Sequence, residues 1–477
     1  EVMSLTLRRH ANAEFFYDMK KNIILILLFC ILTVSLIFSW NSIATQSEIL
    51  YQKIFKYHMS TEFKILLKKT LFVIPVLKKS IKSHKKTIDS YETKINELIG
   101  HININPILSK KIKSKSRTYL IQSYKLPFPD QGSWGGKPLG YIDQTKENII
   151  FVTGNGNFFS IEKKLTKLNK IPFKNIATNI KNIIKDESFY SPSSFSIKDL
   201  LILNNSIFIS YTKELSEDCY NASILVANLD INFLNFREFF SHTKCKKVAS
   251  AWMTGGRMIP FKKNKILFSV GTFTHNSLAQ DKNSLFGKII SIDLNSGDYA
   301  LISMGHRNPQ GLYYSQDKDI IISTEHGPNG GDEININSNF SNNIIENYGW
   351  PISSYGEPDK GGAMPLHKSH KDHGFIEPIK YYTPSIAISE IIKIPESFFQ
   401  DFINDFFVTA LGYEGRINEG QMSIHHLRFN ENYDQVYLED IIPIGERIRD
   451  ILFINETNQI LLVLENTPSL AFLDIIN

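Results

Sequence analysis

The sequence predicts an all-β fold, a six-bladed β-propeller over residues 118–477, preceded by an N-terminal transmembrane helix and a helical stalk. Short apolar runs separated by polar turns begin at about residue 119, and this pattern is typical of sheet proteins. About 360 residues of the pattern divide into six units of roughly 60, slightly more than the usual propeller blade. A pair of packed sheets is the competing architecture.

The apolar runs have the length of strands rather than of helices. They lie at residues 149–153, 200–203, 207–211, 266–270, 288–292, 311–314, 320–324, 406–410, 423–429 and 460–464. The segment Asn204-Asn205-Ser206 separates two of them and is the clearest hairpin turn.

Residues 23–40 are eighteen consecutive residues without a charge, enough for a helix to cross the ~30 Å hydrocarbon layer. Arg8, Arg9, Lys20 and Lys21 precede this segment, so residues 1–22 are predicted to be a cytoplasmic tail. The alternative is a cleaved signal peptide that begins near Met19. In both cases the propeller is exported, and we expect it in the periplasm.

Residues 41–117 carry sixteen Lys and Arg against five Asp and Glu and show helical spacing, which predicts a basic helical stalk. Its basic face would either contact anionic lipid headgroups or be solvated. Residues 118–477 carry a net charge of −7. An acidic main domain argues against a nucleic-acid partner.

Only three cysteines are present, and Cys30 lies in the apolar segment. Cys219 and Cys245 are therefore the exported pair, and an oxidising compartment favours a bridge between them. Two unrelated buried thiols are the alternative.

Two neighbouring segments, residues 305–312 and 325–335, mix Gly and Pro with charged groups at the ends of predicted strands. Propeller loops converge there on the central axis, and binding residues are often on loops. Arg307, Asn308 and Gln310 offer donors that suit a planar, carboxylated ligand. The alternative is that these side chains only satisfy turn backbones.

The second segment also contains oxygen ligands of the kind that Ca²⁺ prefers. They are the carbonyls of Gly327 and Pro328 and the carboxylates of Asp332 and Glu333.

Together these segments resemble the signature of the glucose/sorbosone dehydrogenase family: GHRNPQGL, then EHGP followed by DE-IN, then NYGWP at residues 347–351. GGRM at 255–258, AQD with GKI at 279–289 and RIRD at 447–450 also resemble the family. The resemblance covers about residues 120–477. It implies a six-bladed quinoprotein propeller that binds pyrroloquinoline quinone (PQQ) and Ca²⁺ on its axis and oxidises an aldose or a related alcohol by hydride transfer to the quinone.

Transferred residue by residue, the resemblance gives cofactor-binding roles to Asn308, Gln310, Arg447 and Arg449, with Arg307 in the same motif. It also implies metal ligands. Those are the carbonyls of Gly327 and Pro328, with Asp332 and Glu333 serving either a second calcium or the order of the loop.

Two departures from the family pattern affect the chemistry. Met253 stands where the family has its general-base histidine, two residues before GGR. A thioether cannot accept the hydroxyl proton, and loss of a positioned base typically costs about 10²–10⁴ in rate. Gly412 follows Ala410-Leu411 where the family has a cofactor-contacting lysine.

His326 is the first candidate for a substitute base, ahead of His306 and His275, and Arg307 is the expected catalytic cation beside it. A histidine in such a loop is more often a structural hydrogen-bonder. The sequence therefore favours a PQQ- and calcium-dependent sugar dehydrogenase of altered mechanism. The alternatives are a non-catalytic propeller that binds a glycan or a protein partner, and a hydrolase or lactonase that uses Ca²⁺ alone.

Overall fold

The computed structural model describes residues 101–128, 138–191, 193–249, 251–358, 366–399, 404–412 and 420–476. All of them belong to the second of two compact units, Leu98–Asn477. The predicted tail (1–22), the membrane or signal segment (23–40) and residues 41–100 of the predicted stalk lie outside these ranges. Within the ranges, no helix is long and apolar enough to cross a membrane.

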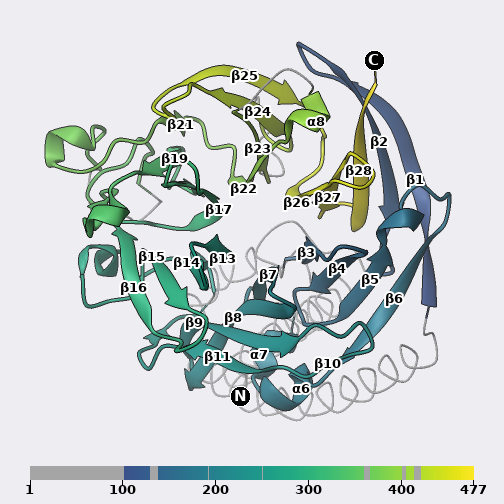
Figure 1. Ribbon diagram of the computed structural model, residues 1–477. Helices are drawn as coiled ribbons and strands as arrows, with labels where there is room; N and C mark the ends of the chain where they lie inside the picture. The colour runs from purple at the N-terminus through teal and green to yellow at the C-terminus, as the bar shows by residue number, and fades with distance from the viewer. Residues whose placement is uncertain are drawn as a thin grey trace, which may run out of the picture. The chain divides into compact units, whose positions relative to one another are not determined.

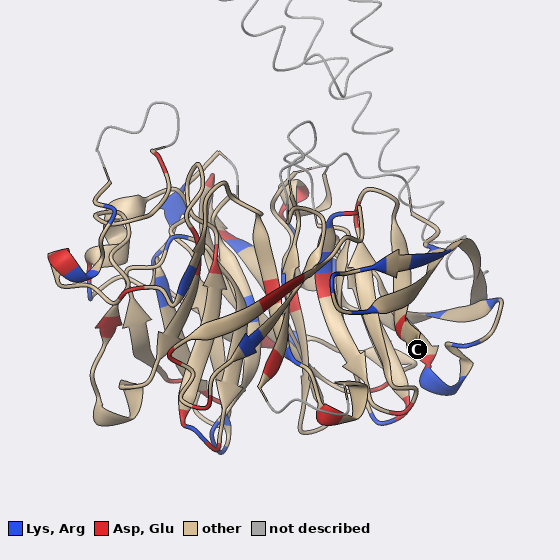
Figure 2. Cartoon of the chain, turned by 90° about the horizontal axis from the view of Figure 1, so that it is seen from above, with Lys and Arg blue, Asp and Glu red and all other residues tan. Residues whose placement is uncertain are grey.

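The described strands form six four-stranded antiparallel blades around a central axis, and the propeller prediction is confirmed (Figure 1). Viewed at right angles, the strands run between two faces of the ring (Figure 2). Blade 1 consists of β3 (Gly140–Gln144), β4 (Asn148–Thr153), β5 (Phe158–Glu162) and β6 (Ile171–Thr178). Blade 2 consists of β7 (Ile197–Leu203), β8 (Ser206–Ser216), β9 (Cys219–Asn228) and β11 (Arg237–Ser241). Blade 3 consists of β13 (Gly255–Phe261), β14 (Lys265–Val270), β15 (Lys288–Asp293) and β16 (Tyr299–Met304).

The other three blades follow in chain order. Blade 4 consists of β17 (Pro309–Ser315), β18 (Ile320–Glu325), β19 (Asp332–Asn337) and β21 (Lys380–Tyr382). Blade 5 consists of β22 (Ile388–Lys393), β23 (Asp405–Ala410), β24 (Ile424–Phe429) and β25 (Val436–Ile442). Blade 6 consists of β26 (Ile448–Ile454), β27 (Gln459–Leu464), β28 (Ser469–Ile476) and, from the N-terminal side, β2 (Thr118–Lys125).

Several short elements connect or extend the blades. The two-residue strands are β10 (Phe233–Leu234), which pairs with β6, β12 (Lys246–Lys247), which pairs with β9, and β20 (Glu346–Asn347), which pairs with β16. The helical turns are η2 (Lys163–Leu165), α6 (Ile180–Ile183), α7 (Glu187–Tyr190), η3 (Asn276–Gln280), η4 (Phe340–Asn342), η5 (Lys371–His373) and α8 (Glu396–Phe399).

The ring closes where β2 pairs antiparallel with β28, from Thr118 opposite Ile476 onward. An additional strand, β1 (His101–Lys113), pairs with β2 and also with β6, and so links blade 6 to blade 1. The predicted helical stalk is therefore wrong for residues 101–113. The reason is the alternation of Ile102 and Ile104 with polar residues: β-branched side chains at a spacing of two favour a strand.

Hydrophobic clusters fill the space between each pair of adjacent blades. The strands in the middle of a blade are covered on both faces, and every residue of β18, β23 and β27 is buried. Continuous apolar runs, rather than alternating ones, are the expected sequence pattern of such strands.

A charged hub occupies the axis. Arg257 of β13 forms ion pairs with Asp199 of β7 (2.7 Å), Asp450 of β26 (3.3 Å) and Glu390 of β22. Its Nε also donates to the carbonyl of Gln310 in β17 at 3.1 Å. One buried guanidinium therefore connects the innermost strands of five blades.

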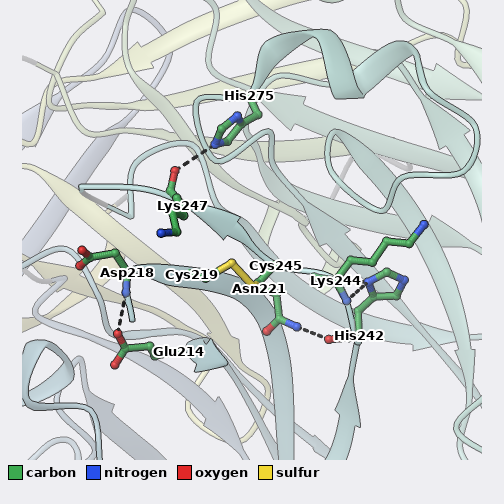
Figure 3. The surroundings of a disulfide bond; sticks show 9 residues. All are labelled: Glu214, Asp218, Cys219, Asn221, His242, Lys244, Cys245, Lys247 and His275. Atoms are coloured by element: carbon green, nitrogen blue, oxygen red, sulfur yellow. Dashed lines mark hydrogen bonds between the residues drawn. A yellow bond between two sulfur atoms is a disulfide. The ribbon is translucent and has the colours of Figure 1, made fainter. Parts of the chain in front are cut away.

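Cys219 and Cys245 form a disulfide with their Cα atoms 5.3 Å apart, which confirms the predicted bridge (Figure 3). The bridge fixes the segment that contains β12 to the start of β9. The carbonyl of Lys247 in that segment lies 3.1 Å from Nε2 of His275. The disulfide therefore supports the chain that leads into Met253.

Candidate active site

The sequence-predicted residues lie on loops, or at the strand ends next to them, at one end of the axis. In an antiparallel blade, the loop before the first strand and the loop between the second and third strands are at the same end. Met253, Arg307 and Arg447 precede β13, β17 and β26, the first strands of their blades. His326 and Gly412 follow β18 and β23, which are second strands.

Arg307 is buried and packs over the ring of Trp350, with the guanidinium carbon 5.3 Å from the ring centroid. Its Nη1 donates to the carbonyl of His326 at 3.2 Å. Asn308 accepts from the side-chain amide of Gln310 at 2.9 Å and from the backbone of Gly255 at 3.1 Å. The first predicted motif is therefore tied to the loop that contains the predicted calcium ligands and to β13.

Arg447 and Arg449 share the carboxylate of Glu465. Arg449 donates to it at 2.7 and 3.2 Å, and Nε of Arg447 donates at 3.3 Å. Burial alone would raise the pKa of the Glu465 carboxyl, but the two guanidiniums outweigh it and hold the pKa below its usual value. Two guanidinium groups therefore lie against a single carboxylate.

His326 lies among these cations. Its pKa falls to about 3, first because of burial and then because of the charges of Arg307, Arg449 and Arg447. The imidazole is therefore neutral at physiological pH, and it is a weak proton acceptor. The site brings together the two predicted arginine motifs and the predicted substitute base.

The loop that contains the predicted calcium ligands connects β18 to β19. No hydrogen bond from the described part of the chain goes to the carbonyl oxygens of Gly327 or Pro328. Gly327 is sterically required, because a Cβ there would come within 2.4 Å of the carbonyl oxygens of Gly330 and Gly331. The carbonyls of Gly327 and Pro328 are the two that the sequence predicted to bind Ca²⁺.

The two acidic residues after this loop are engaged elsewhere. Asp332 accepts from the backbone of Gly327 at 3.0 Å, from the Ser385 hydroxyl at 2.7 Å and from the backbone of Ile386 and Ile388. Its contacts favour the role in loop order over a second calcium.

Glu333 faces His370, with 3.2 Å between Oε1 and Nε2, and Asn335 donates to it at 3.3 Å. Among the described residues, no group of three or more His, Cys, Asp or Glu side chains could hold a metal ion.

Met253 is part of the same site. Its sulfur lies 3.8 Å from Oγ1 of Thr272, and Thr272 in turn donates its backbone N–H to the carbonyl of Arg307 at 3.0 Å. Gly412 has a φ of +64°, and its carbonyl accepts from Nη1 of Arg447 at 2.6 Å. Both departures from the family pattern thus lie beside the arginines.

The other two histidines considered as bases have structural contacts. His306 is fully buried, bonds to the Ser303 hydroxyl at 2.7 Å and stacks on Tyr348. His275 bonds to the backbone of Lys247.

Sequence reasoning missed Glu465 and Thr272. Glu465 comes directly after the apolar run of β27, and an acid at the end of a buried strand is a usable signal. Thr272 has no such signal, because a hydroxyl after a strand is common in turns.

Comparison with known proteins agrees with the fold. Residues 201–470 match the Glucose / Sorbosone dehydrogenase family. The aldose sugar dehydrogenase YliI of Escherichia coli K12 is 30% identical over 230 residues, which are 46% of this chain and 58% of that protein. The chain spans less than two thirds of the length of the curated relatives that it matches.

Two solved structures share the fold. The soluble aldose sugar dehydrogenase of Escherichia coli in its apo form superposes with a TM-score of 0.57 at 20% identity, over 74% of this chain and 99% of that one. The PQQ-bound form of aldose sugar dehydrogenase from Streptomyces coelicolor gives 0.50 at 15% identity, over 75% and 98%. Because the family match covers more than half of the 477 residues, the chain belongs to the glucose/sorbosone dehydrogenase family.

Proposed function

We propose that the axial site binds PQQ and Ca²⁺ and that the protein oxidises an aldose sugar or a related alcohol slowly, because Met253 replaces the usual base. The observation that carries the proposal is the grouping of three arginines at the site: Arg307 donates to the His326 carbonyl, and Arg447 and Arg449 donate to Glu465. PQQ is a tricarboxylate, and guanidinium groups bind carboxylates through paired hydrogen bonds. Family membership and a PQQ-bound relative of the same fold support the assignment.

The residues present fit the cofactor. Arg447, Arg449 and the amides of Asn308 and Gln310 would hold its carboxylates and ring oxygens. The carbonyls of Gly327 and Pro328 would hold the calcium. When bound, PQQ supplies the acceptor for the substrate's hydride.

The protein must remove the hydroxyl proton of the substrate. Met253 cannot accept it, and His326 accepts protons poorly at a pKa of about 3. Burial is the first cause of this low pKa, and the charges of Arg307, Arg449 and Arg447 add to it. Carboxylates of a bound ligand would oppose only the charge part. His326 is thus the candidate for a weak substitute base in the loaded site, with Arg307 holding its backbone carbonyl.

A non-catalytic propeller is the second candidate. The contact between Arg447 and the Gly412 carbonyl favours it, because an arginine engaged with the backbone is held away from a ligand at that position. In this reading the site binds a glycan or a protein partner without redox chemistry.

The test is reconstitution of the purified full chain with PQQ and Ca²⁺, followed by absorption spectra before and after each of a panel of aldoses. We expect slow reduction of the bound cofactor by at least one aldose, and loss of that reduction in Arg447→Gln. Lys318→Gln is the matched control, because it removes one exposed positive charge from the β17–β18 turn. Bound PQQ that no aldose or alcohol reduces would favour the binding module.

We also propose that the propeller is exported from the cytoplasm. The bridge between Cys219 and Cys245 suits an oxidising compartment, and the uncharged residues 23–40 offer a membrane anchor or a signal segment. Protease added to intact spheroplasts should digest the propeller. Protection of the propeller until the cells are lysed would contradict export.

A further inference from the structure

Three large aliphatic side chains are exposed where β1 runs past blade 1. Ile107 and Leu108 of β1 are 47% and 43% exposed, and Leu168 in the turn between β5 and β6 is 46% exposed. β1 lies at the outer edge of the ring, away from the axis (Figure 1). Exposed apolar residues that are scattered singly need no explanation, but a group of them indicates a contact surface.

The two segments that carry these side chains lie side by side. Ile104 of β1 pairs with Ile171 of β6 in an antiparallel ladder, so β1 leaves this ladder in the same direction in which the β5–β6 turn approaches it. Two residues further along β1, Pro106 stands opposite Tyr124 of β2. The hydroxyl of Tyr124 donates to the carbonyl of Leu168 at 2.9 Å. The three exposed aliphatic residues therefore lie close together.

Positive charge is concentrated in the same two segments. Residues 101–128 contain six Lys and Arg, residues 163–178 contain five, and neither range contains an Asp or a Glu. Residues 118–477 as a whole carry a net charge of −7. The basic residues are thus gathered here against the charge of the domain.

Several of these cations stand next to the aliphatic side chains. Lys167 and Lys170 flank Leu168 in the sequence and are exposed, and the exposed Lys125 stands opposite Asn105 in the β1–β2 hairpin. Two other lysines of the turn form ion pairs, Lys163 with Glu456 and Lys164 with Glu162. The exposed aliphatic and basic residues together form the rim patch: Ile107, Leu108, Leu168, Lys125, Lys167 and Lys170.

Lysines on an edge strand also have a simpler role. Beyond Ile104, no strand of the described ranges pairs with the second edge of β1, and lysines keep such an edge from pairing with another chain. This role accounts for Lys110, Lys111 and Lys113 of β1. It does not account for the lysines of the β5–β6 turn or for aliphatic side chains left in water beside them.

Aliphatic side chains among lysines suit a lipid surface that carries negative charge. The ammonium groups are attracted to anionic headgroups, and the aliphatic side chains enter the boundary between headgroups and acyl chains. The centre of a protein–protein interface is instead enriched in aromatic residues and arginine. The sequence before β1 agrees with a lipid surface, because residues 23–40 are uncharged and residues 41–100 contain eleven Lys against five Asp and Glu.

We propose that the rim patch docks the propeller on a bilayer that contains anionic phospholipid. The patch belongs to β1, β2 and the β5–β6 turn and contains none of the residues of the axial site. The inference goes beyond the proposed function and does not rest on it. It also does not depend on whether residues 23–40 form a membrane anchor, because the docking involves the propeller itself.

Hydrogen exchange of the full chain mixed with lipid vesicles tests the docking. Vesicles of phosphatidylcholine and phosphatidylglycerol in equal parts should slow amide exchange in residues 105–111 and 165–170 by at least about threefold. Vesicles of phosphatidylcholine alone should leave exchange in both segments unchanged, because their surface has no net charge for the lysines to bind. A membrane anchor elsewhere in the chain would not by itself slow exchange in these two segments.

Charge variants separate the rim patch from general attraction between the chain and the vesicles. Lys167→Glu/Lys170→Glu should abolish the slower exchange on the mixed vesicles. Lys263→Glu/Lys318→Glu makes the same change of charge at exposed turns of blades 3 and 4 and should keep it. Equal midpoints of urea unfolding show that both variants are folded.

An aliphatic variant tests the apolar part of the patch. Leu168→Ser should remove about half or more of the slowing on the mixed vesicles. Ile344→Ser changes a similarly exposed aliphatic residue outside the patch and should retain the slowing.

Three outcomes would overturn the inference. They are unchanged exchange on the mixed vesicles, equal slowing on phosphatidylcholine alone, and slowing that survives Lys167→Glu/Lys170→Glu. Slowing that needs no vesicles and increases with protein concentration would also overturn it, because the patch would then bind a second copy of the chain.

Discussion

The pKa of His326 depends on burial and on the charged groups around it. This residue shares its loop with the proposed calcium ligands, and three guanidiniums and burial hold its pKa at about 3. A neutral imidazole does not add to the positive charge of the site. An anion beside the arginines would raise this pKa, while burial, its largest cause, would continue to lower it.

This pKa has a consequence for stability. When a base has a lower pKa in the folded chain, the unfolded chain binds the proton first as the pH falls, so the fold loses stability. The loss begins near the ordinary histidine value of 6.5 and is complete near a pH of about 3. When the pH falls from ~7 to ~5, we expect the free energy of unfolding to decrease by roughly 1–2 kcal/mol less in His326→Gln than in wild type.

Urea unfolding at the two pH values measures the difference. His373→Gln, which removes an exposed imidazole, should behave as wild type. A His326→Gln protein that is as acid-sensitive as wild type would mean that the site does not hold this imidazole neutral.

Glu465 provides a second prediction at this scale. Glu465→Gln leaves Arg447 and Arg449 without their carboxylate, and breaking a buried ion pair typically costs about 3–5 kcal/mol. The same change adds one positive charge to the site, so the affinity for PQQ should rise while the stability falls. Denaturant unfolding and a fluorescence titration with PQQ measure the two effects, and a parallel fall in both would contradict this account of the charge.

On the scale of the elements, the disulfide holds the segment before β13, and this segment leads to Met253 in the site. The bridge closes a loop with a sequence separation of 26 residues. Replacing both cysteines by serine should cost about 2–4 kcal/mol. Hydrogen exchange should become faster at Met253 and Thr254, with little change in β27 on the far side of the ring.

Non-reducing peptide mapping of wild type establishes that the bridge is present. Faster exchange spread evenly over all blades, without enrichment next to Cys245, would argue against a local role for the bridge.

Apolar runs predicted the elements well, because strands covered on both faces leave continuous hydrophobic stretches. β1 was predicted as helix because its second half is rich in lysine, and its pairing with β2 and β6 is a tertiary effect. The motifs predicted which loops lie together at one end of the axis. They could not predict that Arg447 and Arg449 share the carboxylate of Glu465, because an ion pair between neighbouring chain segments has no signature in a single sequence.

On the scale of the whole molecule, Arg257 joins the blades at the axis. Arg257→Met leaves the carboxylates of Asp199, Glu390 and Asp450 buried without their cation, and we expect a loss of about 3–5 kcal/mol. Burial, opposed by Arg257, raises the pKa of Glu390 to about 7, so this carboxyl already carries a proton for much of the time at neutral pH. Glu390→Gln should therefore cost less than about 1.5 kcal/mol.

Denaturant unfolding of the two variants under one buffer condition compares them directly. Equal losses would mean that the hub depends on each carboxylate rather than on the guanidinium that joins them.

The cationic site on the axis is tested most directly by a titration of the full chain with PQQ in the presence of Ca²⁺, followed by fluorescence quenching. Wild type should bind, Arg447→Gln should bind at least about tenfold more weakly, and Lys318→Gln should bind as wild type does. Absence of binding by wild type at high PQQ concentration, or equal affinities of wild type and Arg447→Gln, would contradict the assignment of this site to the quinone cofactor.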